Sequence, residues 1–238
     1  MNLLSQVTSA QVTSEEEWIT ELGSTPTWRP PAKPMIVIAP HPDDETLGAG
    51  GLIAGHRRAG LPVIGIAVTD GEAAYADEED LGTIRRNEQE RAFAVLGVEP
   101  SRVIRLKFPD RYVSDYEDRL FDFLKTVVDE ETILVAPWSR DPHSDHEACG
   151  RVAERIHAGR GALLVSYLFW AWHWRAPEEV LREPLCRFEL DSQLQQAKQA
   201  ALAEHHSQLM RAQGDPILPP HLLLPARRSF ETFIVHEQ

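Results

Sequence analysis

Two short segments of the sequence concentrate the side-chain types that bind metal ions. The segment from Pro40 to Thr46 reads Pro-His-Pro-Asp-Asp-Glu-Thr, and a later segment, Asp141 to His146, reads Asp-Pro-His-Ser-Asp-His. A catalytic zinc usually takes three protein ligands from histidine and carboxylate and keeps one position for water. Ligands from one turn alone would hold a divalent ion weakly, so we expect the two segments to build one site. The chemistry expected of such a site is hydrolysis.

The spacing within the two segments divides the roles. His41 and Asp44 can both point outward from a strand-to-helix turn, and His146 at the start of a later helix can complete a mononuclear site. Asp43 is then free to act as general base, taking a proton from metal-bound water. His143 can donate to the oxyanion or to the leaving group.

The same residues also have an ordinary structural interpretation. Acidic residues at the start of a helix stabilise it by interacting with the positive end of the helix dipole. We expect Glu45 to have only this structural role. A His-x-x-His pair can be two solvated side chains, and short motifs occur freely by chance. Both segments, however, follow predicted strands at one edge of the same sheet, a coincidence that the structural interpretation does not explain. We therefore favour the metal site.

The unbroken apolar run at residues 35–39 predicts a strand that is covered on both faces. Four further strands are predicted at residues 62–69, 102–108, 132–136 and 163–169, and helical segments separate the strands. This alternation predicts an α/β fold, a three-layer Rossmann-like sandwich with a mostly parallel sheet and helices on both faces. Ligands bind such sheets beyond the carboxyl ends of the strands, where both metal-binding segments lie.

The chain outside this alternating run adds a lead-in and a tail. Residues 1–34 are expected to form an N-terminal arm with a short helix, opened by a capping box of Ser14 and Glu17, and a proline-rich lead-in. Residues 35–238 are expected to form a single domain. In the tail we expect a strand, a helix, a surface loop and a late strand, at residues 184–190, 193–210, 216–225 and 229–235.

The composition limits the classes of molecule that the protein is expected to bind. With 24 basic and 37 acidic residues the net charge is −13, which repels phosphate backbones and anionic lipid headgroups. We therefore expect a small-molecule partner, with no nucleic acid and no membrane surface; a homo-oligomer is neither indicated nor excluded. Residues 1–14 lack the pattern of a secretory signal. The two cysteines, Cys149 and Cys186, are too few for a disulfide framework, so a cytoplasmic location is expected.

Taken together, the motifs make the sequence resemble the zinc-dependent LmbE-like or PIG-L de-N-acetylases, a family that includes the deacetylases of mycothiol and bacillithiol synthesis. The resemblance rests on Pro40-His41-Pro42-Asp43-Asp44-Glu45 and on His143-Ser144-Asp145-His146. Weaker support comes from Thr69-Asp70-Gly71-Glu72, from the helical pattern between Arg85 and Gly97, and from His205-x-Ser207-Gln208. The resemblance covers about residues 35 to 208.

The resemblance implies the same roles that the spacing indicates. His41, Asp44 and His146 would hold one Zn²⁺ per chain, although another divalent metal would suit the same ligand types. Asp43 would be the general base. His143 would stabilise the tetrahedral intermediate and assist departure of the amine. The implied substrate class is N-acetylated amino sugars, such as an N-acetylglucosaminyl conjugate, with an acetyl or another acyl group removed.

Substrate contacts rest on weaker matches. Arg85 and Asp110 match positions that resemble hydroxyl-binding groups in relatives; alternatively, Arg85 forms an i,i+3 ion pair with Glu88 on a solvated helix. Asp70 would orient a ligand histidine by accepting a hydrogen bond from it, or be an ordinary turn aspartate.

The aromatic run from Phe169 to Trp174 offers rings, Trp172 among them, that suit stacking on a sugar face, although such runs more often pack in a core or an oligomer contact. By the family pattern, His205 would line the pocket; without that pattern it would be a surface residue.

Departures from the family pattern concern the second segment. Ser144 stands where the family often has proline, which should alter loop stiffness more than ligation. Some members place a tyrosine just before the first histidine of this segment to assist at the oxyanion. Asp141 and Pro142 occupy those positions here, so His143 or another loop would have to supply that help.

Other functions fit parts of the pattern. Gly48-Ala49-Gly50-Gly51 follows a strand, as in a nucleotide-binding module, but Ile53 stands where a dinucleotide fingerprint needs glycine, and helix packing explains the glycines better. A metal-dependent hydrolase of a phosphoester or another amide is a second alternative, although phosphoester enzymes usually gather a second metal or several basic groups. Non-catalytic metal binding is a third, and it leaves Asp43 without a role.

Overall fold

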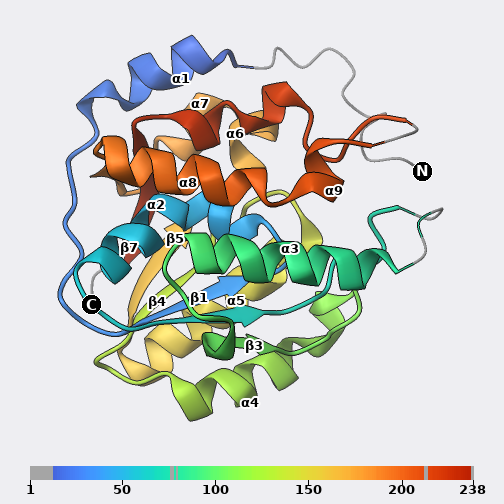
Figure 1. Cartoon of the computed structure of the whole chain (residues 1–238). Helices are drawn as coiled ribbons and strands as arrows, with labels where there is room; N and C mark the ends of the chain where they lie inside the picture. Colours follow the sequence, from blue (N-terminus) through green and yellow to red (C-terminus); the bar gives the residue numbers. More distant parts are fainter. Residues whose placement is uncertain (1–12, 76–77, 79, 212–213, 237–238) are drawn as a thin grey trace.

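A single mixed sheet forms the centre of the computed structural model, which describes residues 13–75, 78, 80–211 and 214–236 (Figure 1). Within these residues the sheet has seven strands in the order β3-β2-β1-β4-β5-β7-β6. The strands are β1 (Met35–Ala39), β2 (Val63–Ala67), β3 (Val103–Arg105), β4 (Ile133–Pro137), β5 (Leu163–Tyr167), β6 (Leu185–Glu189) and β7 (Phe230–His236).

The first five strands run parallel, as the alternating pattern predicts. β7 is antiparallel to both β5 and β6, which makes the sheet mixed at one end. Chain order reverses between β1 and β4, because β2 and β3 lie on one side of β1 while β4 and β5 lie on the other. Such a reversal opens a crevice at the carboxyl ends of the two central strands. The two segments that carry the predicted metal ligands follow β1 and β4, so they meet at this crevice.

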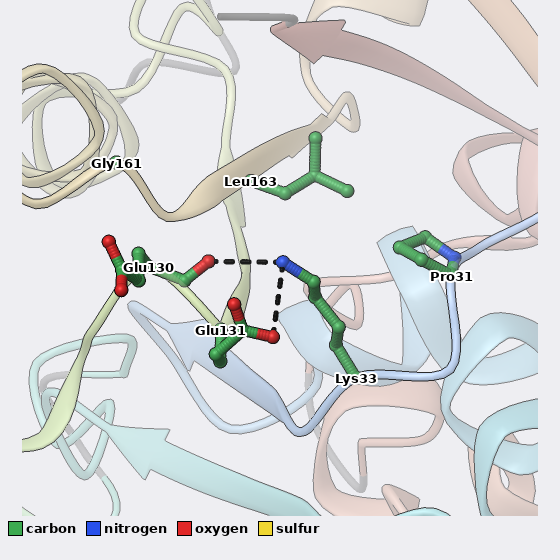
Figure 2. Close-up of a pocket in the computed structure, with 6 residues that line it drawn as sticks. All are labelled: Pro31, Lys33, Glu130, Glu131, Gly161 and Leu163. Atoms are coloured by element: carbon green, nitrogen blue, oxygen red, sulfur yellow. Dashed lines mark hydrogen bonds and ion pairs between the residues drawn. The ribbon is translucent and has the colours of Figure 1, made fainter.

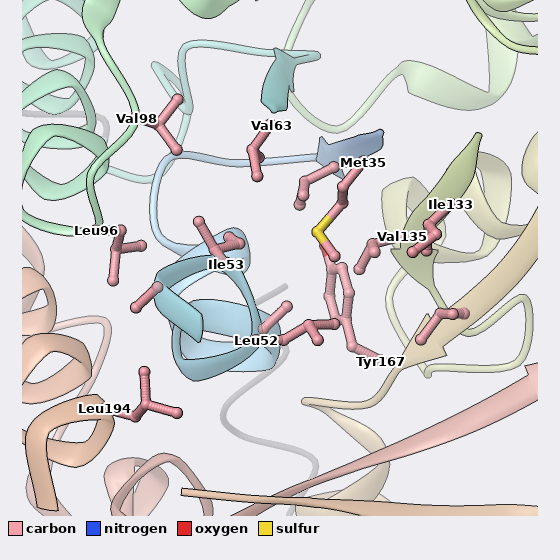
Figure 3. Close-up of a cluster of buried hydrophobic side chains, with 14 of the residues drawn as sticks. Met35, Leu52, Ile53, Val63, Leu96, Val98, Ile133, Val135, Tyr167 and Leu194 are labelled. Atoms are coloured by element: carbon pink, nitrogen blue, oxygen red, sulfur yellow. The ribbon is translucent and has the colours of Figure 1, made fainter. Parts of the chain in front are cut away.

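Helices cover both faces of the sheet and bury its apolar strands, which confirms the three-layer prediction (Figure 1). One face packs against α2 (Asp44–Arg58), α3 (Leu81–Val95) and α8 (Ser192–Ala203). The opposite face packs against α4 (Glu117–Val127) and α5 (Ser144–Arg160). Figure 3 shows the first of these layers, where Leu52 and Ile53 of α2 lie over Met35, Val135 and Tyr167 of the sheet.

The N-terminal helix α1 (Glu15–Glu21) is tied to the body of the protein by a tryptophan. Its predicted capping box is present: the Glu17 amide donates to Ser14 Oγ at 3.2 Å, and the Ser14 amide donates to Glu17 Oε2 at 2.8 Å. Trp18 is 1% exposed and packs edge-on against Trp172, with ring centroids 5.0 Å apart. The predicted arm includes residues 1–12, which lie outside the described residues, and its separation from the domain stays a prediction.

The tail departs from the predicted elements. The helix predicted over 193–210 is divided into α8 and α9 (His206–Leu209), because the backbone at His205 leaves the helical region (φ −82°, ψ 54°). The predicted strand 163–169 stops at Tyr167, and the short helices α6 (Ala171–Trp174) and α7 (Pro177–Val180) follow it. Short 3-10 helices lie in some of the connections: η2 (Leu22–Ser24), η3 (Pro100–Arg102), η4 (Val113–Tyr116), η5 (Pro220–Leu223) and η6 (Pro225–Arg227).

Both cysteines are buried and unpaired. Of the helices in the described part of the chain, none has the length and apolar character that crossing a membrane requires.

Candidate metal centre

The three predicted ligands meet at the crevice between β1 and β4. Asp44 lies between the two histidines: its Oδ2 is 3.0 Å from His41 Nδ1, and its Oδ1 is 3.1 Å from His146 Nε2. The two imidazole rings lie 5.6 Å apart, centroid to centroid. His41 comes from the turn after β1, Asp44 is the first residue of α2, and His146 lies in the first turn of α5, so the fold brings together residues far apart in the sequence.

The environment of these residues fits a cation. His146 Nδ1 is 2.8 Å from Asp141 Oδ2, whereas its Nε2 is buried and faces Asp44 without the geometry of a hydrogen bond. Burial lowers the pKa of His146, but Asp44 and Asp141 outweigh it and raise that pKa to about 9. Positive charge is therefore favoured at this point, and a buried imidazole nitrogen without a hydrogen bond is available to a metal ion.

Further donors surround His41, so the cluster is richer than the predicted ligand set. Ligand atoms of His41, His143 and His146 lie within 4.8 Å of one another, and so do those of His41, Asp110 and Asp145. Burial lowers the pKa of His41, but the carboxylates of Asp110, Asp145 and Asp44 raise it well above its usual value. Nitrogen and carboxylate oxygen together suit zinc and several other divalent ions.

Asp141 is the residue that orients His146, and its role was not predicted. Besides the imidazole, its carboxylate accepts the backbone amides of Phe169, Trp170 and Ala171, at 3.3, 3.2 and 2.6 Å. The carboxylate is fully buried, so these bonds fix its position. A carboxylate behind a ligand histidine sets the tautomer and the direction of the ring. The signal in the sequence was the acidic residue five positions before His146.

Asp145 and Asp110 take the place behind a ligand histidine that the sequence interpretation gave to Asp70. His41 Nε2 is 3.1 Å from Asp145 Oδ2 and 3.3 Å from Asp110 Oδ1. Asp70 instead lies 3.5 Å from Arg105 Nη1 and forms its ion pair there. The prediction for Asp70 was wrong, because the second strand ends one position along the sheet from the crevice.

Asp43 sits in a strained turn directly beside the ligands. Its backbone angles (φ 136°, ψ −27°) fall in a region that residues other than glycine rarely adopt, and such strain collects at functional sites. The Asp43 carbonyl accepts the amides of Thr46 and Leu47 at 2.9 and 2.8 Å, which holds the turn in place. Burial and the negative charge of Asp44 raise the pKa of the Asp43 carboxyl well above its usual value. A raised pKa suits a proton acceptor that works near neutral pH.

His143 lies over the same cluster, with its ring 4.8 Å from that of His41 and 5.1 Å from that of His146, centroid to centroid. Burial and the positive charges of His41 and His146 lower the pKa of His143 to about 3, so its imidazole is neutral at pH 7. Its Nδ1 accepts the Asp145 amide at 3.3 Å. A neutral ring that accepts through Nδ1 carries its proton on Nε2, which makes Nε2 a donor.

Arg85 braces the strained turn and does not form the predicted alternative pair with Glu88. The guanidinium donates to the carbonyls of Gly71, at 2.8 Å, and Pro42, at 3.2 Å. It also donates to Gln208 at 2.7 Å and lies 3.8 Å from Asp43 Oδ1. Glu88 instead accepts from the amide and hydroxyl of Ser207, at 2.8 and 2.6 Å. Nη1 and Nη2 of Arg85 are thus committed to protein groups.

Two residues predicted to contact substrate are buried elsewhere, and Trp172 is the first. It is 5% exposed and packs in the core against Trp18, so its predicted place in the pocket was wrong. The ring that reaches the site belongs to Trp170, which lies parallel to His143 (16° between planes, centroids 6.1 Å apart) and stacks on Trp174 at 4.4 Å. Trp170 and Trp172 point in different directions because side chains two residues apart lie on different sides of a helical turn. The sequence does not show which of the two faces the site.

His205 is the second: it is buried behind the start of α2, against Thr46 and Glu45. It is fully buried, with Nε2 3.3 Å from Thr46 Oγ1 and 3.7 Å from Glu45 Oε1. Burial, followed by the positive charge of Arg85, lowers the pKa of His205 to about 3. Burial also raises the pKa of Glu45 to about 7, and its Oε2 accepts Gln89 Nε2 at 2.9 Å. Both contacts agree with a structural role for Glu45.

A groove on another part of the molecule contains none of the predicted site residues. Figure 2 shows it lined by Pro31, Lys33, Glu130, Glu131, Gly161 and Leu163. Lys33 Nζ donates to the Glu130 carbonyl at 3.2 Å and lies 3.5 Å from Glu131 Oε2. These residues precede or begin β1, β4 and β5, so the groove lies at the amino ends of the strands, away from the crevice.

Comparison with protein families matches residues 36–157 to the PIG-L model, described as GlcNAc-PI de-N-acetylase. The chain is 30% identical over 131 residues to a probable N-acetyl-alpha-D-glucosaminyl L-malate deacetylase 2 of Bacillus subtilis, covering 51% of this chain and 59% of the relative. It is 30% identical over 127 residues to a diacetylchitobiose deacetylase of Thermococcus kodakarensis, covering 50% and 46%. The match thus spans only about half the length of these curated relatives.

Solved structures share the fold over more of the chain. An N,N'-diacetylchitobiose deacetylase from Pyrococcus horikoshii superposes with a TM-score of 0.65 at 22% identity, covering 91% of this chain and 86% of that one. A conserved protein from Thermus thermophilus superposes with a TM-score of 0.56 at 26% identity, covering 73% and 79%. The predicted α/β architecture is therefore that of known proteins.

Proposed function

The chain belongs to the PIG-L family of GlcNAc-PI de-N-acetylases, and from this premise we propose that it is a metal-dependent hydrolase that removes the N-acetyl group from an amino-sugar conjugate. The observation that carries the proposal is one cluster at the β1/β4 crevice. His41, Asp44 and His146 contact one another there, and Asp43 and His143 adjoin them.

His41, Asp44 and His146 would hold the metal, and the ligand types favour zinc. A divalent ion at this place supplies Lewis acidity, which polarises an amide carbonyl and lowers the pKa of water. Asp141 and Asp145 would keep the imidazoles in the required direction, through the 2.8 Å contact to His146 and the 3.1 Å contact to His41.

Asp43 and His143 would move the protons of the reaction. Asp43, held in its strained turn, takes a proton from the attacking water as oxygen bonds to the acetyl carbon. His143 donates through Nε2 to the oxygen that becomes negative in the tetrahedral intermediate. When the carbon–nitrogen bond breaks, the departing nitrogen takes up the proton that Asp43 removed from water, and the products are acetate and a free amine. Neither histidine nor aspartate is consumed.

The substrate class follows the relatives, which are named for N-acetylglucosaminyl malate and diacetylchitobiose. We propose the shared element, an N-acetylglucosaminyl unit, as the part recognised here. Asp110, beside His41, remains the proposed hydroxyl-binding residue because its side chain lies at the metal cluster. Arg85 supports the turn with two of its three nitrogens, so we propose no direct sugar contact for Nη1 or Nη2.

A panel of substrates tests the proposal. The metal-loaded protein is incubated with N-acetylglucosaminyl conjugates that differ in the group at the anomeric carbon, and free amine and acetate are quantified. We expect both products in equal amounts from at least one conjugate. Release of phosphate from phosphoesters, with no amine released from any conjugate, would instead favour the phosphoester alternative.

A further inference from the structure

Helix α2 is broken one turn after the residues that would bind the metal. Ala49 has non-helical angles (φ −142°, ψ 15°), so α2 consists of two helical pieces joined at that residue. The first piece carries Asp44. An unbroken α-helix would pair the Gly51 amide with the Leu47 carbonyl. A break leaves both groups in need of other partners, because both residues are buried.

A buried ion pair takes the place of that hydrogen bond. Glu231 of β7 accepts the Gly51 amide at 2.7 Å through Oε1 and the Leu52 amide at 2.8 Å through Oε2. Lys198 of α8 donates to the Leu47 carbonyl at 3.0 Å and to Glu231 Oε1 at 2.7 Å. The carboxylate thus caps the second piece of α2, and the ammonium terminates the first. α8 and β7 both pack on α2, and their side chains meet at the break through the Lys198–Glu231 contact.

The glycines around the break admit these neighbours. A Cβ at Gly51 would lie 2.3 Å from Leu190 Cδ2 and 3.2 Å from Glu231 Cδ, and one at Gly50 would lie 3.2 Å from Lys198 Cγ. A Cβ at Gly48 would lie 2.3 Å from Tyr167 Cδ2. The glycine run therefore serves close packing at the helix break, in agreement with the interpretation drawn from its spacing.

We propose that Lys198 and Glu231 are positioning residues that set the direction of the first turn of α2 and thereby hold Asp43 and Asp44 in register with His146. The Asp43 carbonyl bonds to the Leu47 amide, and the Leu47 carbonyl bonds to Lys198, so a continuous chain of contacts links the ion pair to the strained turn. The effects on metal affinity and on turnover rest on the proposed function; the effect of the ion pair on the direction of the first turn of α2 does not.

A positioning role distinguishes this pair from a pair kept only for stability. Lys198 is 2% exposed and Glu231 is 4% exposed. For a buried ion pair of this kind, the free energy lost by removing both charges from water offsets the attraction between them. An apolar pair of similar volume would therefore be tolerated in many cores. The backbone groups that these two side chains satisfy are specific to the break in α2.

The test compares three variants with the wild type at a temperature where each is folded: Lys198→Met, Glu231→Gln and the double variant. Zn²⁺ affinity is measured by competition with a chelator, and amide exchange of Gly51 and Leu52 by NMR. We expect affinity to fall by at least about tenfold in the double variant and both amides to exchange faster. Turnover of a conjugate should fall in kcat with little change in KM.

Glu15→Gln is the matched control. It breaks another ion pair with a buried arginine, in which Arg228 donates to both Glu15 carboxylate oxygens at 2.6 and 2.8 Å, but Glu15 lies on α1. Its melting temperature should fall while Zn²⁺ affinity and the α2 amides keep wild-type values.

Wild-type Zn²⁺ affinity and unchanged exchange in the double variant would overturn the proposal. If Lys198→Met does not fold, Glu231→Gln decides alone, because it keeps the shape of the side chain and one acceptor oxygen. If the wild type releases no amine from any conjugate, the proposed function fails, and the exchange measurement still decides whether the ion pair sets the direction of the first turn of α2.

Discussion

At the scale of single residues, the hydrogen-bond partners of each histidine in the site decide which of its ring nitrogens can act in the reaction. His146 Nε2 faces Asp44 because Asp141 holds Nδ1, and His143 carries its proton on Nε2 because the Asp145 amide occupies Nδ1. The neighbours of a histidine, more than the histidine itself, decide which nitrogen is available for chemistry.

Asp141→Asn tests this support. The amide keeps the shape and one acceptor oxygen but removes the negative charge that faces His146 Nδ1. We expect Zn²⁺ affinity to fall by about 10- to 100-fold, with activity partly restored by excess zinc. Chelator competition measures the affinity. Asp70→Asn is the control, because Asp70 pairs with Arg105, and its Zn²⁺ affinity should match the wild type; equal affinity in both variants would contradict the role of Asp141.

Sequence patterns predict the residues that share a short motif and fail for those that depend on packing. His41, Asp44 and His146 could be grouped because both motifs follow strands of one predicted parallel sheet, at the same edge. That β1 and β4 are neighbours is known from the structure alone. Trp172, His205 and Asp70 were placed wrongly. The direction of each depends on a helix phase, a helix break or a position along the sheet, and none of these is set by local residue types.

At the scale of elements, the central strands and helices form because their apolar patterns are consistent with the layers that cover them. β1 is buried along its whole length, as an unbroken apolar run predicts. The sequence did not predict the break in α2 at Ala49. The backbone groups at the break bond to Glu231 and Lys198, which lie in distant segments of the chain, and the glycine-rich start of the helix does not indicate these contacts.

Gly48→Ala tests the packing of α2 on the sheet. The added Cβ would lie 2.3 Å from Tyr167 Cδ2, and Tyr167 is held by its hydroxyl bond to the Ile38 carbonyl at 3.0 Å. Overpacking of this kind costs about 1–3 kcal/mol, so the midpoint of urea unfolding should fall. Gly159→Ala is the control, because nothing lies within 4 Å of its Cβ and the residue is helical. That variant should gain up to about 1 kcal/mol; a Gly48→Ala protein as stable as Gly159→Ala would contradict the packing.

At the scale of the whole molecule, the body of the protein encloses histidines that are neutral when it is folded. Burial lowers the pKa of His173 to about 4, whereas an unfolded chain has a histidine pKa of about 6.5. As pH falls below 6.5, the unfolded state binds a proton first, so the folded state loses stability until the pH reaches about 4.

His173→Phe should reduce this acid sensitivity. From the two pKa values, the histidine costs the folded state about 2 kcal/mol at pH 5 and almost nothing at pH 7.5. The difference in unfolding free energy between these two pH values, measured by urea denaturation of the metal-free protein, should therefore be smaller by about that amount in the variant. His206→Gln, at an exposed position, should leave the difference unchanged. An identical pH dependence in the wild type and His173→Phe would show that His173 is not buried neutral.

The central claim is that Asp43 moves the proton while other residues hold the metal. The most direct test is Asp43→Asn, with bound zinc and release of amine from an N-acetylglucosaminyl conjugate measured on the same sample. We expect zinc bound as in the wild type, with kcat lower by about 10²- to 10⁴-fold, the usual contribution of a general base. Full turnover in this variant would contradict the assignment, and loss of zinc together with turnover would make Asp43 a metal ligand.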